Sequence, residues 1–364
     1  MAAAENARAD VAAGMVVSFA AQALRYFDRP HESVARAPIA SPAAWRGEEL
    51  AGRDDFVFEL SRAQLRELEQ ASRRVLARVG ALEVGSQGRR ALAGLRRDDF
   101  PLPGLEQAIA GWRRELAYGR GLLVVRGLPV ERWGDDLCAC AYWGLGLHLG
   151  APGAQNPQGD LLGDVRDTGE DASDPFVRRY RTSGDIAYHC DLADVVGLLC
   201  LRRAARGGES RVASSVAVYN ALLARAPERV GRLYEPFLLD SRNEEKDGRR
   251  PYLPVPPCRH AGGVLRTFYH SDYFRSVARH PGVGALAPDD LALLDLYDEV
   301  ASSEALRLDM TLEVGDIQLL SNHFVVHARR AYRDAHDPRE RRHLLRLWLS
   351  LRNDEAATGH PGSA

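Results

Sequence analysis

The chain has 364 residues, of which 45% are hydrophobic and 27% are charged, an ordinary globular composition. The 48 lysines and arginines nearly balance the 50 acidic residues, and the formal net charge of -2 excludes a strongly basic nucleic-acid binder and an acidic disordered chain. No apolar run approaches the roughly 18 residues of a membrane-spanning helix, so we expect no membrane partner.

The first fifty residues are rich in alanine and weakly patterned. Three prolines interrupt any long helix there, so residues 1–50 are predicted to be an N-terminal arm that is partly irregular. A short apolar run at 56–60 then predicts a strand. Ser61 and Gln64 form a capping-box pattern, and the apolar residues after them recur every three or four positions up to Val79, which predicts an amphipathic helix.

Three further elements are predicted before residue 150. Apolar periodicity indicates helices at 105–118 and 135–147, and a Gly-bounded apolar run indicates a buried strand at 121–127. No internal repeat or low-complexity linker separates this region from the rest of the chain. We therefore expect its helices to pack against one face of a barrel, within a single catalytic domain that spans residues 51–364.

From residue 185 onward, short apolar runs alternate with turn residues. The runs that predict strands lie at 195–201, 211–216, 237–239, 264–269, 306–312, 317–320, 325–331 and 344–351. Two helical insertions, at 217–233 and 288–300, interrupt them. Short strands at this spacing predict a β-sandwich, jelly roll or barrel, which together with the earlier helices makes an α+β fold.

Cysteine usage and the N-terminal sequence indicate the compartment. The five cysteines are few and odd in number, which argues against a disulfide framework and favours a reducing cytoplasm. A signal-like segment from Val11 to Leu24 contains Ser18 and Gln22, and the residues before it lack the net positive charge of a secretory signal. We therefore expect a cytoplasmic protein.

The most informative motif is the H-x-D pair formed by His189 and Asp191. Side chains at positions i and i+2 of a strand point the same way, so this imidazole and this carboxylate converge on one point. Tyr188 directly precedes His189, so strand alternation points its side chain away from the metal, and we expect it to pack in the core. One more histidine would complete a facial triad of the kind that non-haem Fe(II) oxygenases use, with three open coordination sites.

His327 is the best candidate for the third ligand, because it lies on a late predicted strand of the barrel. His323 is its nearest rival, but it directly follows Asn322 in a predicted turn. The remaining histidines, among them His148, His270 and His280, have no matching partner pattern and are read as structural.

Two arginines share one face of the last predicted strand. Arg342, Leu344 and Arg346 alternate with period two, so Arg341 should point outward. A buried arginine that faces a metal centre can hold a carboxylate through two parallel hydrogen bonds, and 2-oxoglutarate offers such a carboxylate. The alternative is that these arginines form surface ion pairs in an arginine-rich protein.

Taken together, these segments resemble the taurine dioxygenase-like (TauD/TfdA) family of Fe(II)/2-oxoglutarate-dependent dioxygenases. The resemblance covers about residues 120–352 and rests on His189-Cys190-Asp191, Gly207-Gly208-Glu209-Ser210, Gly315-Asp316, His327-Ala328-Arg329 and Arg342-His343-Leu344. It implies a double-stranded β-helix, a distorted jelly roll or cupin-like barrel with flanking helices. It also implies Fe(II) as cofactor, 2-oxoglutarate and O₂ as co-substrates, and, as a family expectation only, a homo-oligomer.

The resemblance also implies roles for single residues. The iron ligands of the family match His189, Asp191 and His327. Arg342 matches the arginine that grips the distal carboxylate of 2-oxoglutarate, and Ser210 stands where the family usually has threonine. The segment between His327 and Arg342 is slightly longer than in the shortest relatives.

Substrate-binding residues are harder to predict. Arg346 matches an arginine that faces the substrate anion in sulfonate-using relatives, and Asn322 would join it if both face the pocket. Gln155 and Asn156 lie in a Pro/Gly-rich loop, and loops on a rigid scaffold often bind substrates. These residues favour a small anionic or zwitterionic substrate, such as an amino-acid derivative.

The predicted activity is therefore oxidation, by default hydroxylation, of an unactivated C–H bond. Desaturation or ring closure would use the same ligands. Two other classes stay open: a zinc-dependent hydrolase with the same His/Asp/His set, and a non-catalytic cupin-like binding module.

Overall fold

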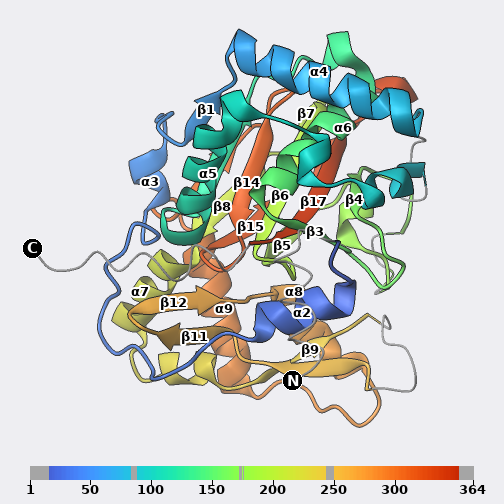
Figure 1. Cartoon of the computed structure of the whole chain (residues 1–364). Helices are drawn as coiled ribbons and strands as arrows, with labels where there is room; N and C mark the ends of the chain where they lie inside the picture. Colours follow the sequence, from blue (N-terminus) through green and yellow to red (C-terminus); the bar gives the residue numbers. More distant parts are fainter. Residues whose placement is uncertain (1–15, 83–87, 172–173, 175, 243–249, 352–364) are drawn as a thin grey trace, which may run out of the picture.

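The computed structural model describes residues 16–82, 88–171, 174, 176–242 and 250–351. Helices and sheets are mixed in this part of the chain, as the predicted α+β class requires (Figure 1). Two sheets form its centre, and they are compatible with the predicted jelly roll.

The larger sheet contains seven strands within the described residues. Its order is β1 (Val57–Glu59), β2 (Leu122–Arg126), β14 (Ile317–Ser321), β6 (Val195–Arg202), β17 (His343–Ser350) and β3 (Ala151–Gly153), and β4 (Leu162–Val165) also pairs with β17. Only the β1–β2 pair among these is parallel. Every residue of β14 and β17 is buried, because helices cover one face of the sheet and the site lies against the other.

The smaller sheet has four strands in the order β13 (Arg307–Met310), β8 (Ser210–Ser214), β15 (Val325–Arg329) and β5 (Ile186–His189). Three short antiparallel pairs accompany the two sheets: β9 (Phe237–Asp240) with β10 (Tyr252–Val255), β11 (Cys258–Ala261) with β12 (Val264–Thr267), and β7 (Arg206–Gly207) with β16 (Tyr332–Arg333).

The α-helices are α2 (Phe19–Phe27), α3 (Gly47–Leu50), α4 (Arg62–Val79), α5 (Glu106–Tyr118), α6 (Val130–Leu149), α7 (Ser215–Arg225), α8 (Ser271–Ser276) and α9 (Pro288–Ser302). Short 3₁₀ helices lie at Gly88–Gly94, Arg97–Asp99, Pro103–Leu105, Arg179–Arg181, Val230–Tyr234, Val277–Arg279 and Pro338–Glu340. The predicted capping box of α4 is confirmed, because Ser61 Oγ accepts from the Gln64 amide while Gln64 Oε1 accepts from the Ser61 amide.

Several element boundaries differ from the prediction. The helix predicted at 217–233 is α7 followed by a 3₁₀ turn, because Pro227 cannot continue the helical hydrogen bonds. The helix predicted from 135 begins at Val130 and is interrupted at Gly134, which has a φ of 76°. The sequence pattern does not predict strands β3, β4, β10 and β11 or helices α2 and α8. Residues 11–15 of the signal-like segment lie outside the described residues.

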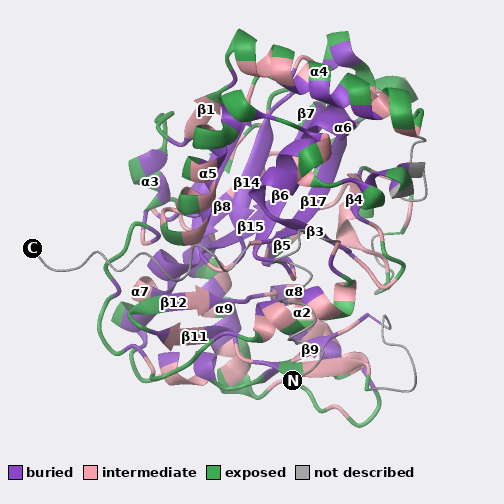
Figure 2. Cartoon of the chain, viewed as in Figure 1, coloured by how far each residue is buried: buried purple, intermediate pink, exposed green. Residues whose placement is uncertain are grey.

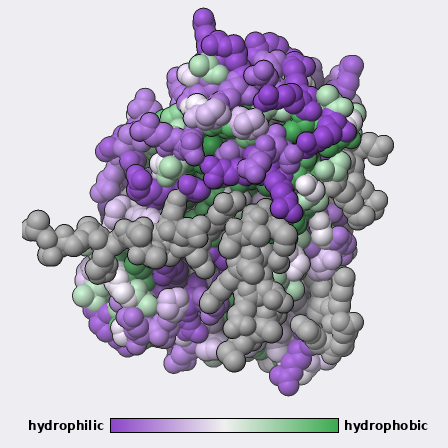
Figure 3. Space-filling view, viewed as in Figure 1, coloured by the Kyte–Doolittle hydropathy of each residue, from purple (hydrophilic) through white to green (hydrophobic). Residues whose placement is uncertain are grey.

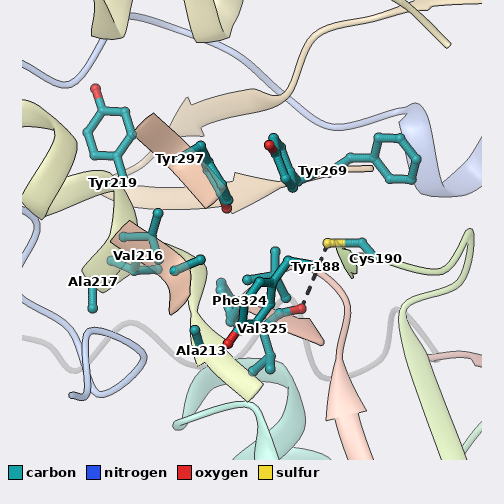
Figure 4. Close-up of a cluster of buried hydrophobic side chains, with 14 of the residues drawn as sticks. Tyr188, Cys190, Ala213, Val216, Ala217, Tyr219, Tyr269, Tyr297, Phe324 and Val325 are labelled. Carbon is teal, nitrogen blue, oxygen red and sulfur yellow. Dashed lines mark hydrogen bonds between the residues drawn. The ribbon is translucent and has the colours of Figure 1, made fainter. Parts of the chain in front are cut away.

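Two apolar cores flank the sheets (Figure 2). One packs α4, α5 and α6 on the larger sheet. The other lies among the smaller sheet, α7 and α9, where the rings of Tyr269 and Tyr297 stack with centroids 3.8 Å apart (Figure 4). Tyr188 is buried in this second core, as its predicted orientation requires.

The outer surface is mainly polar on the face shown in Figure 3. Within the described residues, the large apolar side chains with the greatest exposure are dispersed, and Leu24 on α2 is 51% exposed. None of the helices in these residues combines the length and apolarity needed to cross a membrane.

Candidate active site

Three side chains with metal-binding atoms meet between the two sheets. The candidate ligand atoms of His189, Asp191 and His327 all lie within 4.8 Å of one another. His327 Nε2 lies 3.8 Å from Asp191 Oδ2, and the rings of His189 and His327 have centroids 4.2 Å apart. This arrangement agrees with the predicted ligand set.

Strand register explains the convergence. In the antiparallel pair of β5 and β15, His189 lies directly opposite His327. Asp191 follows the end of β5, and its backbone N–H donates to Asn322 Oδ1 at 3.0 Å. Residues opposite each other on one face of a sheet are near neighbours, so the H-x-D pair and a histidine some 140 positions later become adjacent.

Hydrogen bonds leave metal-binding atoms available. The Nδ1 atom of His189 lies 2.9 Å from the carbonyl oxygen of Ala187, so it is the protonated nitrogen and Nε2 keeps its lone pair. Asp191 Oδ2 is buried and has no hydrogen-bond partner among the described residues. Two imidazole nitrogens and one carboxylate oxygen are a donor set that suits Fe(II), and a buried carboxylate oxygen without a donor fits a site that receives a cation.

Electrostatics keep Asp191 and His327 in the protonation states that a metal requires. Burial raises the pKa of Asp191, but the charge of Arg346 and the two histidines outweigh burial and hold this pKa below its usual range. Burial, together with His189, lowers the pKa of His327 to about 3. The carboxylate is therefore ionised and His327 neutral near pH 7.

A small cavity of about 80 Å³ lies on one side of the triad, and Arg342 faces it. Arg342 is buried, and burial lowers the pKa of its guanidinium. In the described part of the chain it forms no ion pair with a carboxylate, and its Nη1 has no hydrogen-bond partner. A buried guanidinium in this state suits an anionic ligand. Arg341, next to it, is exposed, so the predicted alternation of the two arginines is confirmed.

Ser210 and Arg329 line the same cavity and lie opposite each other in the pair of β8 and β15. The Ser210 hydroxyl donates to Gln318 Oε1 at 3.0 Å. Arg329 was not singled out by the sequence analysis, although it lies two residues after His327 and strand periodicity puts it on the same face. It donates to the carbonyls of Thr182 and Gly184, and burial lowers its pKa to about 10.

Arg346 lies against the triad. Its Nη1 is 3.4 Å from Asp191 Oδ1, and its Nε donates to Gln155 Oε1 at 2.7 Å. Gln155 is buried, and its amide nitrogen donates to the carbonyls of Leu161 and Arg346. The side chain predicted to contact substrate therefore holds Arg346 in place, and Arg346 in turn contacts the candidate ligand Asp191.

The other two predicted substrate residues lie in different places. Asn322 is fully buried, and its amide is occupied by the backbone of Asp191 and by the Ala193 carbonyl. Asn156 lines a second, larger cavity and is hydrogen-bonded to Asp160 within its own loop. Of these two residues, only Asn156 borders a space that a substrate could enter.

The remaining histidines divide into two groups. His148 contacts the Phe100 carbonyl at 2.6 Å, His280 contacts Asp240, and His323 contacts Asp194, so all three have structural partners. His270 differs from the structural role assigned to it: its ring lies 5.1 Å from that of His189 and borders the larger cavity. Only the fold brings this histidine to the site, since no spacing in the sequence relates it to the H-x-D pair.

Gly208 offers a local test of the Arg342 cavity. Its φ is +80°, and a Cβ placed there would lie 3.1 Å from Arg342 Nε. Gly208→Ala should displace the guanidinium and weaken binding of 2-oxoglutarate roughly tenfold, in addition to about 1 kcal/mol of backbone strain. Gly282→Ala is the matched control, because its φ is +78° and no atom lies within 4 Å of the new Cβ.

Calorimetric titration with 2-oxoglutarate and thermal unfolding separate the two effects of Gly208→Ala. Both variants should lose a similar amount of stability, and only Gly208→Ala should lose affinity. Equal affinity in the two variants would argue against the placement of the ligand beside Arg342.

Comparison with known proteins agrees with this geometry. The family model "Taurine catabolism dioxygenase TauD, TfdA family" matches residues 88–348. FR-33289 synthase of Streptomyces rubellomurinus is 32% identical over 329 residues, which are 88% of this chain and 92% of that protein. Taurine hydroxylase-like protein SAT17 of Stachybotrys chartarum is 28% identical over 312 residues, 84% of this chain and 77% of that protein.

Solved structures share the fold at low sequence identity. An asparagine oxygenase in complex with Fe(II), 3-hydroxyasparagine and succinate has a TM-score of 0.63 at 18% identity, covering 82% of this chain and 94% of that one. The non-haem iron oxygenase OrfP in complex with Fe and α-ketoglutaric acid has a TM-score of 0.56 at 16% identity, covering 81% and 94%. With the family match spanning most of the chain, the protein belongs to the taurine catabolism dioxygenase TauD, TfdA family, and it is an oxygenase.

Proposed function

We propose that the protein is a non-haem Fe(II)- and 2-oxoglutarate-dependent dioxygenase that oxidises, by default hydroxylates, an unactivated C–H bond of a small anionic or zwitterionic molecule. The observation that carries the proposal is the convergence of His189, Asp191 and His327 beside a cavity lined by Arg342. Arg342 is buried and pairs with no carboxylate among the described residues. A zinc hydrolase would have no use for that guanidinium.

Each residue of the site has a defined task in this proposal. His189, Asp191 and His327 hold Fe(II) and leave one face open. Arg342 binds the distal carboxylate of 2-oxoglutarate, and the Ser210 hydroxyl supplies a second hydrogen bond by turning its proton from Gln318 Oε1 to that carboxylate. Arg346, fixed by Gln155, balances the charge of the buried Asp191.

When bound, the metal and its co-substrate supply the oxidising power, with decarboxylation of 2-oxoglutarate to succinate as the accompanying reaction. The chain's own residues orient the two ligands and the substrate. They do not distinguish hydroxylation from desaturation or ring closure, since these outcomes differ in the fate of the substrate.

The remaining features of the proposal rest on the family and on its solved members. The strands are assigned to a double-stranded β-helix in one catalytic unit, residues 51–364, preceded by the arm at 1–50. The neighbours were solved with hydroxylated amino acids, which supports a small polar substrate. A cytoplasmic location and a homo-oligomer stay predictions.

Anaerobic spectroscopy tests the proposal. Fe(II) and 2-oxoglutarate added together without O₂ should give a weak visible metal-to-keto-acid charge-transfer band, because the keto acid chelates the metal. Fe(II) alone, or Zn(II) with 2-oxoglutarate, should give none. Absence of the band in protein that binds both ligands by calorimetry would contradict the proposal and favour the hydrolase or the binding module.

A further inference from the structure

A second cavity, of about 690 Å³, lies beside the candidate metal centre and is called the α2 chamber here. It is bounded by α2, by residues 190–192 after β5, by the ends of β9 and β10, and by His270 and Tyr273. Asp191 borders both this chamber and the Arg342 cavity. Two separate spaces thus meet at one candidate metal ligand.

Helix α2 gives the chamber an apolar wall. Phe19, Ala23 and Phe27 recur at every fourth position and line the space, together with Ala20 and Leu24. All five of these side chains are apolar, yet they are only partly buried or exposed. An apolar helix face that borders a cavity favours a ligand with an apolar part.

Contacts of Arg25 and Tyr26 fix helix α2 beside the candidate metal centre. Arg25 donates to Asp194 and to the Leu351 carbonyl, and the Tyr26 ring stacks on His323 at 4.6 Å. Asp194 follows Asp191 by three residues and also accepts from His323. Burial raises the pKa of Asp194, but hydrogen bonds from His323 and Arg25 hold this pKa well below its usual range. Asp194 is therefore ionised, and its ion pair with Arg25 keeps α2 in place.

Two polar side chains of the lining, His270 and Arg178, meet at Tyr273. His270 stacks on Tyr273 at 3.6 Å, and its Nδ1 is buried with no hydrogen-bond partner in the described part of the chain. Arg178, which donates to the Tyr273 hydroxyl, and Arg250 also line the space.

The charge balance of the lining favours an anion. Apart from the candidate ligand Asp191, Asp240 is the acidic residue among the described residues that line the chamber. Its oxygens already accept from the side chains of Arg279, His280 and Ser276. Asp240 therefore offers no charge for a cationic ligand, whereas Arg178 and Arg250 attract an anionic one.

The volume of the α2 chamber argues against the smallest candidate substrates. A cavity of roughly 150 Å³ already holds a benzene molecule, and drug-sized ligands occupy about 300–1,000 Å³. The α2 chamber falls in the second range, so a free small amino acid would leave most of it unfilled.

We infer that the α2 chamber is the substrate site and that it binds an amphiphilic organic anion. The apolar part lies along Phe19, Ala23 and Phe27, and the acidic group is near Arg178 and Arg250. This inference rests on the proposed function for the chemistry, but it concerns the residues of the arm, which that function does not require.

A series of N-acylglycines tests the inference. Glycine and its acetyl, butanoyl, hexanoyl and octanoyl derivatives are titrated by calorimetry into protein loaded anaerobically with Fe(II) and 2-oxoglutarate. Affinity should increase about fourfold for each buried methylene until the chamber is filled. Octanoylglycinamide, the neutral counterpart, should bind at least about tenfold more weakly than octanoylglycine.

Two variants locate the binding. Ala23→Trp should remove the gain in affinity with chain length, because the indole occupies the space of the acyl group. Ala77→Trp, on the exposed side of the distant helix α4, is the matched control and should leave the series unchanged. The double variant Arg178→Gln/Arg250→Gln should abolish the preference for the acid over the amide.

The outcomes separate the two proposals. If the charge-transfer band forms but affinity does not depend on chain length, the substrate assignment is overturned and the proposed function stands. If the band does not form, the proposed function fails, whatever the acylglycines do. If Ala23→Trp and Ala77→Trp lost the gain in affinity with chain length equally, the assignment would also be overturned, because that gain would not depend on the α2 chamber.

Discussion

Replacing His327 by alanine should abolish Fe(II)-dependent succinate formation, and His189→Ala should do the same. Each substitution removes one of three candidate ligands from a site whose donor atoms lie within 4.8 Å of one another. Loss of a residue that merely supports a metal ligand costs about 10–100-fold in metal affinity, so loss of a ligand should cost at least about 100-fold. Equilibrium dialysis against Fe(II) under argon measures the change directly.

His323 supplies the control for this experiment. It is the nearest histidine in the sequence to His327, but its Nε2 contacts Asp194 at 3.0 Å and does not join the triad. His323→Gln should lower stability yet keep Fe(II) affinity within about threefold, as expected for a residue outside the coordination sphere. Retained Fe(II) binding in His327→Ala, with loss in His323→Gln, would reverse the assignment.

The metal site could be predicted because strand geometry is local and regular. Period two puts His189 and Asp191 together, and the same rule separates Arg342 from Arg341. Both predictions agree with the structure, in which Arg342 is buried and Arg341 is exposed. The capping box at Ser61 is another short-range signal that the structure confirms.

Other parts of the site depend on contacts that no local pattern encodes. His270 reaches His189 through an isolated bridge between distant segments. Gln155 lies in a polar loop, but its side chain is buried and accepts a hydrogen bond from Arg346, which lies far from it in the sequence. Helix α2 lies in the alanine-rich arm, where the weak sequence pattern does not predict it. The role of its apolar positions is visible only in the structure, where they line a cavity.

Arg329 shows how a usable signal can be overlooked. It follows His327 by two residues, so it shares the face of a predicted ligand, yet single arginines carried little weight in a chain so rich in them. In the structure, Arg329 and Arg342 each lie 4.9 Å from the Tyr332 ring centroid. With Arg346, which pairs with Asp191, three buried arginines line the cavity beside the triad, and Arg329 strengthens the case for an anionic ligand.

Replacing Arg342 by alanine should raise the dissociation constant of 2-oxoglutarate by a factor of about thirty to several thousand. The guanidinium is buried, so its bond to a carboxylate is shielded from water and charge-assisted. Truncating one partner of such a pair costs on the order of 2–5 kcal/mol, which corresponds to that range of affinity. Calorimetric titration of 2-oxoglutarate into metal-loaded protein gives the constant.

Arg342→Lys should recover little of the lost affinity, since an ammonium group cannot form two parallel hydrogen bonds with one carboxylate. Arg341→Ala is the matched control: it removes the same side chain one position earlier, where it is exposed, and should leave the constant nearly unchanged. Because the two positions point to opposite sides of the chain, the comparison tests the register of β17 as well as the role of Arg342. Loss of affinity in Arg341→Ala with retention in Arg342→Ala would mean that the co-substrate binds on the other side of this strand.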